Sequence, residues 1–474
     1  IGGKDSMSGS FNELDVPSTL VSFALAPGLA SLALSPEFKQ AGSTVSLVET
    51  PILENELPDF VALREIAESL HSLNTDGKIL SLHHIGKPGI AAALTKMCLG
   101  NGIGFEGNGP LASAGGHQPR YFAFLIEHVT ADCLRQTLPT STSIGTTTKE
   151  PTLTISGKIH SLSELQTVFE ATLEPIYPTK PDTTKEGLPL AAQQPKPSTD
   201  HRSLITRHSA PKVFIPSFPG TNSEYDSARA FMRAGAETHI EVFRNLSAKH
   251  IGESITALAD GIASSQILFI PGGFSAGDEP DGSAKFIATI LRNPRISDAI
   301  SDLLENRDGL ILGICNGFQA LIKVGLATHG KVIDTGSESA TLVHNNISRH
   351  ISQYVSTRVA ANSSPWLTNM EIGEIHSVPV SHGEGKFFAS QEVIASLAAN
   401  GQIATQYCDP SGNPTMEHPF NPNGSLGAIE GITSPCGRVF GKMAHSERFS
   451  RNVAKNIPGN KNQPIFDAGT TYFH

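Results

Sequence analysis

The periodic pattern of hydrophobic and polar positions changes once along the chain. In the first part, apolar runs and helical spacings predict five elements without strict alternation: strands at 44–50 and 121–127, and helices at 60–73, 89–100 and 161–175. The helix at 89–100 is expected to end at Gly100. Because strands and helices do not alternate strictly here, we expect an α+β domain.

The order of predicted strands and helices changes after residues 178–211. This segment is rich in proline, threonine, serine and lysine, and we interpret it as a linker. Beyond it, apolar strands alternate with helices: strands at 212–218, 238–243, 267–273 and 310–314, and helices at 223–235 and from Asn316. This α/β alternation predicts a doubly wound parallel sheet, in which ligands bind at the carboxyl ends of the strands. A glycine pair, Gly272-Gly273, and Cys315 lie at such ends.

Composition narrows the class of protein. The formal net charge of −10 and the isoelectric point near 6.0 argue against nucleic acid as the main partner. The most apolar early segment, 18–34, is interrupted by Pro27 and Gly28, so we expect a buried strand with its exit loop and no membrane span. Acidic residues precede this segment, unlike a signal peptide. Since the first residue is Ile1, we expect the true N-terminus to lie upstream.

Five cysteines are present and none forms a CxxC pair, so we expect reduced thiols and a cytoplasmic protein. One of them, Cys315, lies in GICNG (313–317). Glycines on both sides allow a sharp turn from strand to helix, and the helix N-terminus behind the cysteine favours its thiolate form. From this pattern alone, a nucleophile and a buried structural cysteine are equally good interpretations.

Two further features favour the nucleophile. Backbone N–H groups at Gly272-Gly273 are suited to an oxyanion hole, although an ordinary tight loop is the more common meaning of two glycines. Later, GRVFGKMAHSERF (437–449) predicts a strand on which His445 and Glu447 share one face. His445 would then accept the proton of Cys315, and Glu447 would orient the imidazole. Together these residues predict a Cys-His-Glu site for acyl transfer.

Six motifs cover the C-terminal part nearly end to end: PSFPGTNSEYD (216–226), PGGFSAGD (271–278), GICNGFQ (313–319), VSHGEGKF (380–387), NPNGS (421–425) and HSERF (445–449). In these motifs the chain resembles the class I glutamine amidotransferases, and more narrowly the glutaminase domain of the phosphoribosylformylglycinamidine synthases, a family of purine biosynthesis. The resemblance implies a flavodoxin-like glutaminase domain at 212–474. It also implies these site residues: the nucleophile Cys315, the base His445, its orienting partner Glu447, and oxyanion N–H groups from Gly273 and Asn316.

The N-terminal residues GGKDSMSGSF (2–11) resemble a nucleotide-site loop in the synthetase part of the same family. The spacing alone favours a plain turn, because it does not match a Walker loop. The resemblance implies an auxiliary ATP or ADP with Mg²⁺, held by phosphate contacts from Lys4, Ser6 and Ser8 and by a metal ligand at Asp5. It further implies a remnant of a synthetase ATP-binding-type domain at 1–35 and an α+β domain similar to that of AIR synthetase at 36–177.

Many family members carry His-Asp-x-Ser-Asp-Gly-Gly where this chain has HHIGKPG (83–89), so we expect this half to lack a reacting site of its own. The resemblance implies an ATP-dependent conversion of formylglycinamide ribonucleotide (FGAR) to formylglycinamidine ribonucleotide (FGAM), with glutamine as the amide donor. The implied partners are glutamine, FGAR, ATP and a missing N-terminal synthetase half. Two alternatives stay open: a cysteine hydrolase of similar fold that acts on other acyl compounds, and a truncated non-catalytic remnant.

Overall fold

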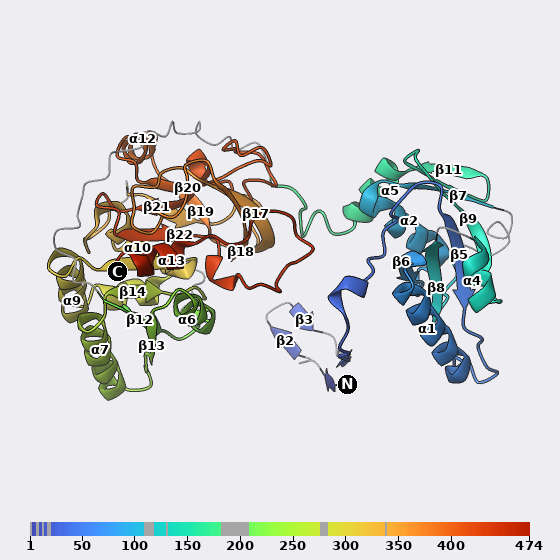
Figure 1. Ribbon diagram of the computed structural model, residues 1–474, viewed down its shortest axis with the longest axis horizontal. Coiled ribbons are helices and arrows are strands. Elements are labelled where there is room, and N and C mark those ends of the chain that lie inside the picture. Colours follow the sequence, from blue (N-terminus) through green and yellow to red (C-terminus); the bar gives the residue numbers. More distant parts are fainter. Residues whose placement is uncertain are drawn as a thin grey trace. The chain divides into compact units, whose positions relative to one another are not determined.

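Two units make up the part of the chain that the structure describes, Ile1–Ile176 and Tyr177–His474 (Figure 1). The computed structural model describes residues 2–5, 9–11, 14–16, 20–108, 118–128, 131–181, 208–274, 283–336 and 339–474. Most of the predicted linker therefore lies outside the described residues. No helix within these ranges has the length and apolar character needed to cross a membrane.

The first unit is built on a seven-stranded sheet in the order β11-β10-β7-β9-β5-β8-β6. Its strands are β5 (Thr44–Glu49), β6 (Ile79–His84), β7 (Gly104–Gly107), β8 (Ala123–His128), β9 (Thr142–Thr148), β10 (Thr152–Ile155) and β11 (Lys158–Ser161). Neighbours are antiparallel except β10 and β7, which are parallel. The strands predicted at 44–50 and 121–127 are confirmed as β5 and β8.

Helices cover both faces of this sheet. Those described are α1 (Phe60–Thr75), α2 (Gly89–Asn101), α4 (Ala131–Thr137) and α5 (Leu162–Ala171). Val45 and Leu47 of β5 share a core with α2, whereas Val48 shares another with α1, because side chains alternate along a strand. The three predicted helices are confirmed. Helix α2, however, continues through Gly100 and ends at Asn101, because the next residue, Gly102, has a left-handed backbone that caps it.

The first residues form two short ribbons outside this sheet. Strand β1 (Gly2–Asp5) pairs with β4 (Leu20–Phe23), and β2 (Gly9–Phe11) pairs with β3 (Leu14–Val16); a 3₁₀ turn, η1 (Ala30–Leu32), follows. The expectation of a buried strand at 18–34 is wrong, because Phe23, Leu25 and Leu29 are 57%, 90% and 70% exposed. A two-stranded ribbon has no second layer to cover its apolar side chains.

A nine-stranded sheet organises the second unit, in the order β13-β12-β14-β15-β22-β21-β20-β17-β18. Its strands are β12 (Lys212–Ser217), β13 (Glu237–Val242), β14 (Ile267–Ile270), β15 (Leu310–Ile314), β17 (Ile351–Val359), β18 (Ile375–His382), β20 (Ile403–Tyr407), β21 (Ile429–Thr433) and β22 (Val439–Lys442). Neighbours from β13 to β22 are parallel, and those from β22 to β18 are antiparallel. The sheet is therefore mixed.

The prediction of a doubly wound parallel sheet is correct for the first half of this sheet and wrong for the second. The connections explain the difference. Only residues 434–438 join β21 to β22, which is too short for the crossover that parallel neighbours need. A separate two-stranded antiparallel sheet pairs β16 (Thr341–Val343) with β19 (Lys386–Phe388).

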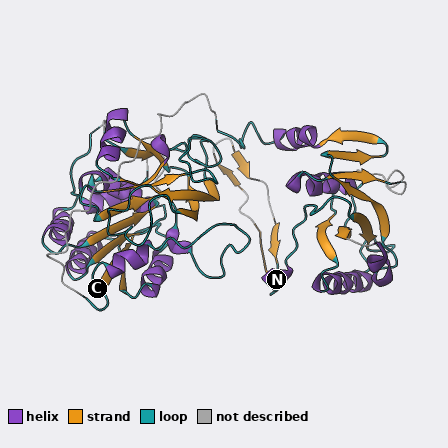
Figure 2. Cartoon of the chain, turned by 45° about the horizontal axis from the view of Figure 1, so that its top comes forward, coloured by secondary structure: helices purple, strands orange, loops and turns teal. Residues whose placement is uncertain are grey.

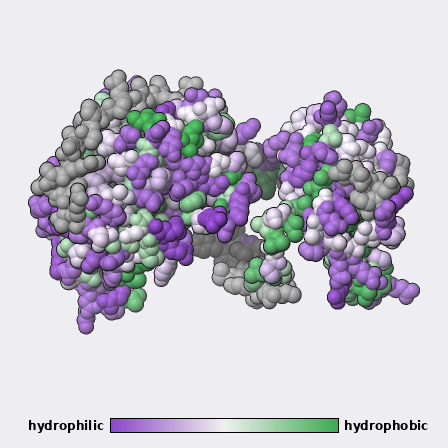
Figure 3. Space-filling model, viewed as in Figure 1, coloured by the Kyte–Doolittle hydropathy of each residue, from purple (hydrophilic) through white to green (hydrophobic). Residues whose placement is uncertain are grey.

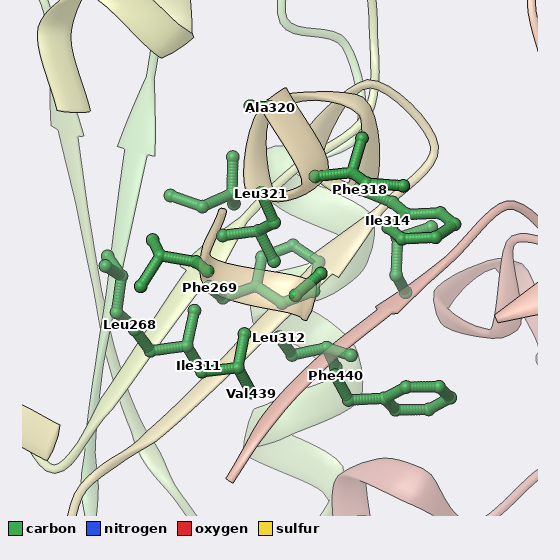
Figure 4. Close-up of a cluster of buried hydrophobic side chains, with 14 of the residues drawn as sticks. Leu268, Phe269, Ile311, Leu312, Ile314, Phe318, Ala320, Leu321, Val439 and Phe440 are labelled. Atoms are coloured by element: carbon green, nitrogen blue, oxygen red, sulfur yellow. The ribbon is translucent and has the colours of Figure 1, made fainter. Parts of the chain in front are cut away.

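Figure 2 shows helices lying around the strands of the second unit, and buried side chains from both form one large hydrophobic core. Its helices are α6 (Glu224–Arg233), α7 (Ala248–Ala263), α8 (Lys285–Leu291), α9 (Pro294–Glu305), α10 (Asn316–Lys323), α11 (Leu326–His329), α12 (Gln391–Ala399) and α13 (Ile465–Thr471). Figure 4 shows how Phe318 and Leu321 of α10 lie with Phe269 of β14 and Leu312 of β15 in the core. This packing places the start of α10 at the carboxyl end of β15.

Replacing Phe269 with alanine should cost about 3–5 kcal/mol of unfolding free energy, because its ring is fully buried. The ring centroid lies 5.5 Å from that of Phe231 and 6.5 Å from that of Phe466. The single tryptophan, Trp366, belongs to the same core, so its fluorescence during denaturant unfolding reports on this unit. Tyr225→Ala, at a side chain that is 67% exposed, is the control and should change stability within about 0.5 kcal/mol. Equal losses would contradict this packing.

Candidate active site

Cys315 lies at the turn from β15 into α10 with unusual backbone angles, φ 54° and ψ −110°. A positive φ is costly for a residue with a side chain, so the surroundings must impose it. A Cβ atom at Gly317 would lie 2.0 Å from the carbonyl oxygen of Ile270, and one at Gly313 would lie 2.5 Å from Leu321 Cδ1. The two glycines therefore let α10 approach β14 and β15 closely, which forces the sharp turn at Cys315.

His445 and Glu447 follow the end of β22 at Lys442. His445 Nδ1 and Glu447 Oε1 are 2.5 Å apart, and the two side chains are 1% and 0% exposed. The predicted pair is therefore present, but the predicted reason, alternation along a strand, is wrong. The strand has already ended, and Ser446–Arg448 form a 3₁₀ turn, η3, so the curvature of the chain brings the carboxylate to the imidazole.

The His445 imidazole is wholly buried among charged partners. Burial lowers its pKa, but the charges of Glu447 and Cys315 outweigh burial and raise the pKa to about 9. Burial raises the pKa of the Glu447 carboxyl, yet the His445 charge more than offsets this, and the pKa is lowered. The two groups therefore form an imidazolium–carboxylate pair at neutral pH. Among the described residues, His445 Nε2 has no hydrogen-bond partner, so it is available for proton transfer.

Gly272 stands beside both Cys315 and His445. A Cβ atom at this position would lie 3.3 Å from Cys315 Cβ and 3.0 Å from His445 Cε1. The Gly272 N–H donates to Ser223 Oγ at 2.9 Å, which ties the glycine turn to the start of α6. The structure thus brings together the cysteine, the histidine and the glycine turn that the sequence predicted separately.

The next residue, Gly273, requires the absence of a side chain. Its φ is 145°, and a Cβ atom would lie 2.4 Å from the carbonyl oxygen of Gly220. Within the described part of the chain, the Gly273 N–H donates to no backbone acceptor. Asn316 is the first residue of α10 and follows Cys315 directly in the chain. Gly273 follows Gly272, which adjoins Cys315, and the oxyanion role of Gly273 and Asn316 stays a prediction.

Residues of β18 complete the surroundings of Cys315 and were not predicted as site residues. The Cys315 Sγ atom lies 3.7 Å from the carbonyl oxygen of Ser381. The next residue, His382, is buried, and burial together with the charges of His445 and His350 lowers its pKa to about 3. His382 is therefore neutral at physiological pH, and its Nδ1 lies 3.2 Å from Asn345 Oδ1. The motif VSHGEGKF was the available signal for Ser381 and His382; no motif marked Asn345.

The predicted nucleotide site lies largely outside the described residues. Ser6 and Ser8 are among the undescribed positions, and Lys4 and Asp5 belong to β1 but their side chains are not described. Within the described ranges, no group of three His, Cys, Asp or Glu residues is placed to hold a metal ion. The nucleotide and Mg²⁺ roles therefore remain predictions.

The segment HHIGKPG runs from the end of β6 into α2. It lines a small cavity of about 150 Å³ together with Lys96 from the same helix, and no acidic residue is among the cavity's lining. Burial, followed by the charges of Lys96 and His84, lowers the pKa of His83. None of the described lining residues is acidic, and the absence of a reacting site in this half stays a prediction.

The part of the chain that contains this candidate site is similar to known proteins. Residues 210–473 match the family profile of the CobB/CobQ-like glutamine amidotransferase domain. The PurQ subunit of phosphoribosylformylglycinamidine synthase from Methanococcus maripaludis is 38% identical over 246 residues, which are 52% of this chain and 85% of that protein. The PurQ subunit from Dehalococcoides mccartyi is 36% identical over 51% of this chain and 86% of that protein. Phosphoribosylformylglycinamidine synthase from Drosophila melanogaster is 32% identical over 52% of this chain and 18% of that longer protein.

The matched range contains the cysteine turn, the His–Glu pair and the glycine turn, and it accounts for more than half of the chain. The chain therefore belongs to the glutamine amidotransferases with a CobB/CobQ-like domain. Within that class, the relatives above place it in the family of the phosphoribosylformylglycinamidine synthases.

Gly272→Ala should slow alkylation of Cys315 about tenfold, because the added methyl group crowds both Cys315 and His445. The rate is measured with iodoacetamide, by mass spectrometry of the peptide that contains Cys315. Gly252→Ala on α7 is the matched control, since its Cβ would meet nothing within 4 Å. That variant should keep the wild-type rate and gain about 0.5–1 kcal/mol of stability. An unchanged rate in Gly272→Ala would show that position 272 does not adjoin the thiol.

Glu447→Gln should lower the pKa of His445 from about 9, because the carboxylate that raises it is lost while burial remains. In the wild type, the raised pKa adds stability that is fully present below pH 6.5 and lost as the pH rises to about 9. This contribution is at most about 3 kcal/mol. Denaturant unfolding between these pH values should show a decline in the wild type and a flatter profile in Glu447→Gln.

The control for this comparison is Glu392→Gln, at the first turn of α12, where a carboxylate with a lowered pKa does not titrate in this pH window. Its pH profile should follow that of the wild type. Parallel profiles for Glu447→Gln and the wild type would be evidence against the imidazolium–carboxylate pair.

Proposed function

We propose that this chain hydrolyses glutamine at Cys315 and supplies the ammonia to a synthetase that converts FGAR to FGAM. One observation carries the proposal: a buried His445–Glu447 pair lies beside a cysteine held in a strained strand-to-helix turn. Family membership supports the choice of glutamine, and the names of the relatives support phosphoribosylformylglycinamidine synthase as the complete enzyme.

In the first half of the reaction, the Cys315 thiolate attacks the carbon of the glutamine side-chain amide while His445 holds the proton. The negative charge that develops on the amide oxygen is stabilised by the N–H groups of Gly273 and Asn316. His445 Nε2 then gives its proton to the amide nitrogen. The carbon–nitrogen bond breaks, ammonia leaves, and a glutamyl thioester remains on Cys315.

In the second half, the neutral His445 takes a proton from water, and the resulting hydroxide attacks the thioester carbon. The carbon–sulfur bond breaks, glutamate leaves, and the Cys315 thiolate and the imidazolium are restored. Throughout, Glu447 fixes the ring through Nδ1 and stabilises its positive charge. The raised pKa of His445 suits this cycle, because the imidazole must carry a proton before ammonia departs.

For the acceptor reaction, we propose ATP-dependent amidation of FGAR by a synthetase module of which this sequence holds only part. The mainly antiparallel sheet of the first unit, with helices on both faces, supports an α+β assignment for it. The proposed division of the chain is a synthetase remnant at 1–35, an AIR-synthetase-like domain at 36–177, a linker at 178–211 and the glutaminase domain at 212–474. The proposed location is the cytoplasm, where reduced thiols persist.

Cys315→Ala should abolish the release of glutamate from isotope-labelled glutamine, because no other group takes over the attack on the amide. The assay uses the full chain, with labelled glutamate followed by mass spectrometry. Cys436→Ala is the matched control, since Cys436 is a free and partly exposed thiol that has no contact with the His–Glu pair. It should hydrolyse glutamine at the wild-type rate.

Glutamate release that persists in Cys315→Ala would overturn the proposal. The mass of the trapped intermediate separates glutaminase from the alternative of a general cysteine hydrolase. A glutamyl adduct on Cys315, formed from glutamine at neutral pH, is the expected result. Adducts formed equally well from unrelated amides or esters would favour the hydrolase, and the absence of any adduct or turnover would favour a non-catalytic remnant.

A further inference from the structure

One fully buried ion pair adjoins the His445–Glu447 pair and has no part in the chemistry above. Lys442 ends β22, and Glu430 lies in the neighbouring strand β21. Both side chains are 0% exposed, and Lys442 Nζ lies 3.3 Å from Glu430 Oε1. Charged side chains are rarely buried to this extent unless they are paired, so the position of this pair needs a reason.

All three N–H bonds of the Lys442 ammonium have an acceptor. Besides Glu430, Nζ donates to the carbonyl oxygen of Ala444 at 2.7 Å and to Ser446 Oγ at 3.0 Å. Ala444 and Ser446 are the residues immediately before and after His445. One buried ammonium group therefore holds the chain on both sides of the residue that carries the imidazole.

Glu430 also binds the segment around His445, through its carboxylate. Its Oε1 accepts the Ala444 N–H at 2.7 Å, and its other carboxylate oxygen accepts the hydroxyl of Thr405 on β20. Ser446 Oγ, which accepts from Lys442, donates in turn to Gln463 Oε1 at 2.5 Å. The segment around His445 is thus tied to three parts of the fold by hydrogen bonds that are shielded from water, and such bonds are stronger than exposed ones.

Lys442 also holds the nucleophile, through its backbone. The Cys315 N–H donates to the Lys442 carbonyl oxygen at 2.8 Å, as the next step of the parallel pairing between β15 and β22. The backbone of Lys442 therefore binds the cysteine turn, and its side chain binds the histidine turn.

We propose that Lys442, supported by Glu430, is a positioning residue for glutamine hydrolysis: it fixes the His445 imidazole relative to Cys315 by holding both neighbours of His445. The inference rests on the proposed function. Its physical basis is that proton transfer needs the imidazole within hydrogen-bonding reach of the reacting atoms, and a displacement of about 1 Å is enough to lower a rate about a hundredfold.

An ion pair that only stabilises the fold is the competing explanation. Buried pairs are weak evidence for stability, because the cost of removing two charges from water offsets most of their attraction. A partly buried ion pair at the start of β22 serves for comparison. Arg438, just before β22, lies 2.6 Å from Asp308 through Nη1 and Oδ1, and Asp308 also accepts the hydroxyl of Tyr472. That pair lies at the end of β22 away from His445.

The test compares glutamine hydrolysis by the wild type and by the double variant Glu430→Gln/Lys442→Met in the full chain. The double variant removes both charges together, so no unpaired charge stays buried. We expect kcat to fall about tenfold or more with KM within about threefold, because the variant disturbs the placement of His445 and not the binding of glutamine. A structural role alone would change the unfolding free energy without this split between kcat and KM.

The matched control is Asp308→Asn/Arg438→Gln, which removes this partly buried pair and should lower stability while kcat stays within about twofold of the wild type. A folded Glu430→Gln/Lys442→Met variant with wild-type kcat would overturn the inference, and so would an equal loss of kcat in the control.

If the double variant does not fold, the variant Ser446→Ala provides the test, since it removes one acceptor of the Lys442 ammonium. Ser446→Ala should lower kcat, and an unchanged kcat would overturn the inference. A wild type without glutaminase activity would instead overturn the proposed function.

Discussion

The parallel pairing of β15 with β22 is the constraint on which the site depends. Ile314 pairs with Lys442 at the carboxyl ends of the two strands, and the Cys315 N–H donates to the Lys442 carbonyl oxygen. The cysteine turn and the histidine turn therefore leave the sheet side by side, although they are far apart in the sequence. Because both strands are fully buried, the pairing leaves little freedom for the distance between the two turns.

Glycines around Cys315 allow the close packing that brings the thiol and the imidazole together. Gly313 and Gly317 let α10 lie against the sheet, and this imposes the positive φ of Cys315; Gly272 then leaves room beside the thiol for the His445 ring. Strain of this kind persists only where the surrounding structure enforces it, and it is common at reactive residues. Burial then makes the charge of Glu447 effective, since little water screens it from the imidazole.

The evidence for function differs between the two units. The family match covers residues 210–473 and therefore concerns the second unit, which contains the predicted Cys315, His445 and Glu447. The first unit has its own sheet and two cores, and it exposes apolar side chains at its first residues. Its proposed assignment to a synthetase module rests on the sequence resemblance and on its α+β architecture; of the residues with a predicted nucleotide role, Lys4 and Asp5 belong to β1.

The sequence by itself determined the residue types of the site and the elements that carry them. Periodicity and glycine placement predicted β14, β15 and α10, and motif spacing singled out Cys315, His445 and Glu447. The antiparallel half does not alternate strands with helices in the same way, because loops such as 360–374 join its strands, so the α/β pattern did not predict it. The burial of 18–34 was predicted wrongly, because hydrophobicity does not reveal whether a second layer exists to cover it.

Only the tertiary structure decided which groups surround the cysteine and how their charges act. Ser381, Asn345 and the Lys442–Glu430 pair reach the site through strand pairing between distant segments, which local patterns do not encode. The raised pKa of His445 likewise depends on the distance to Glu447 and on the exclusion of water. Residue identity is a property of the sequence, whereas dielectric environment and distance are properties of the folded chain.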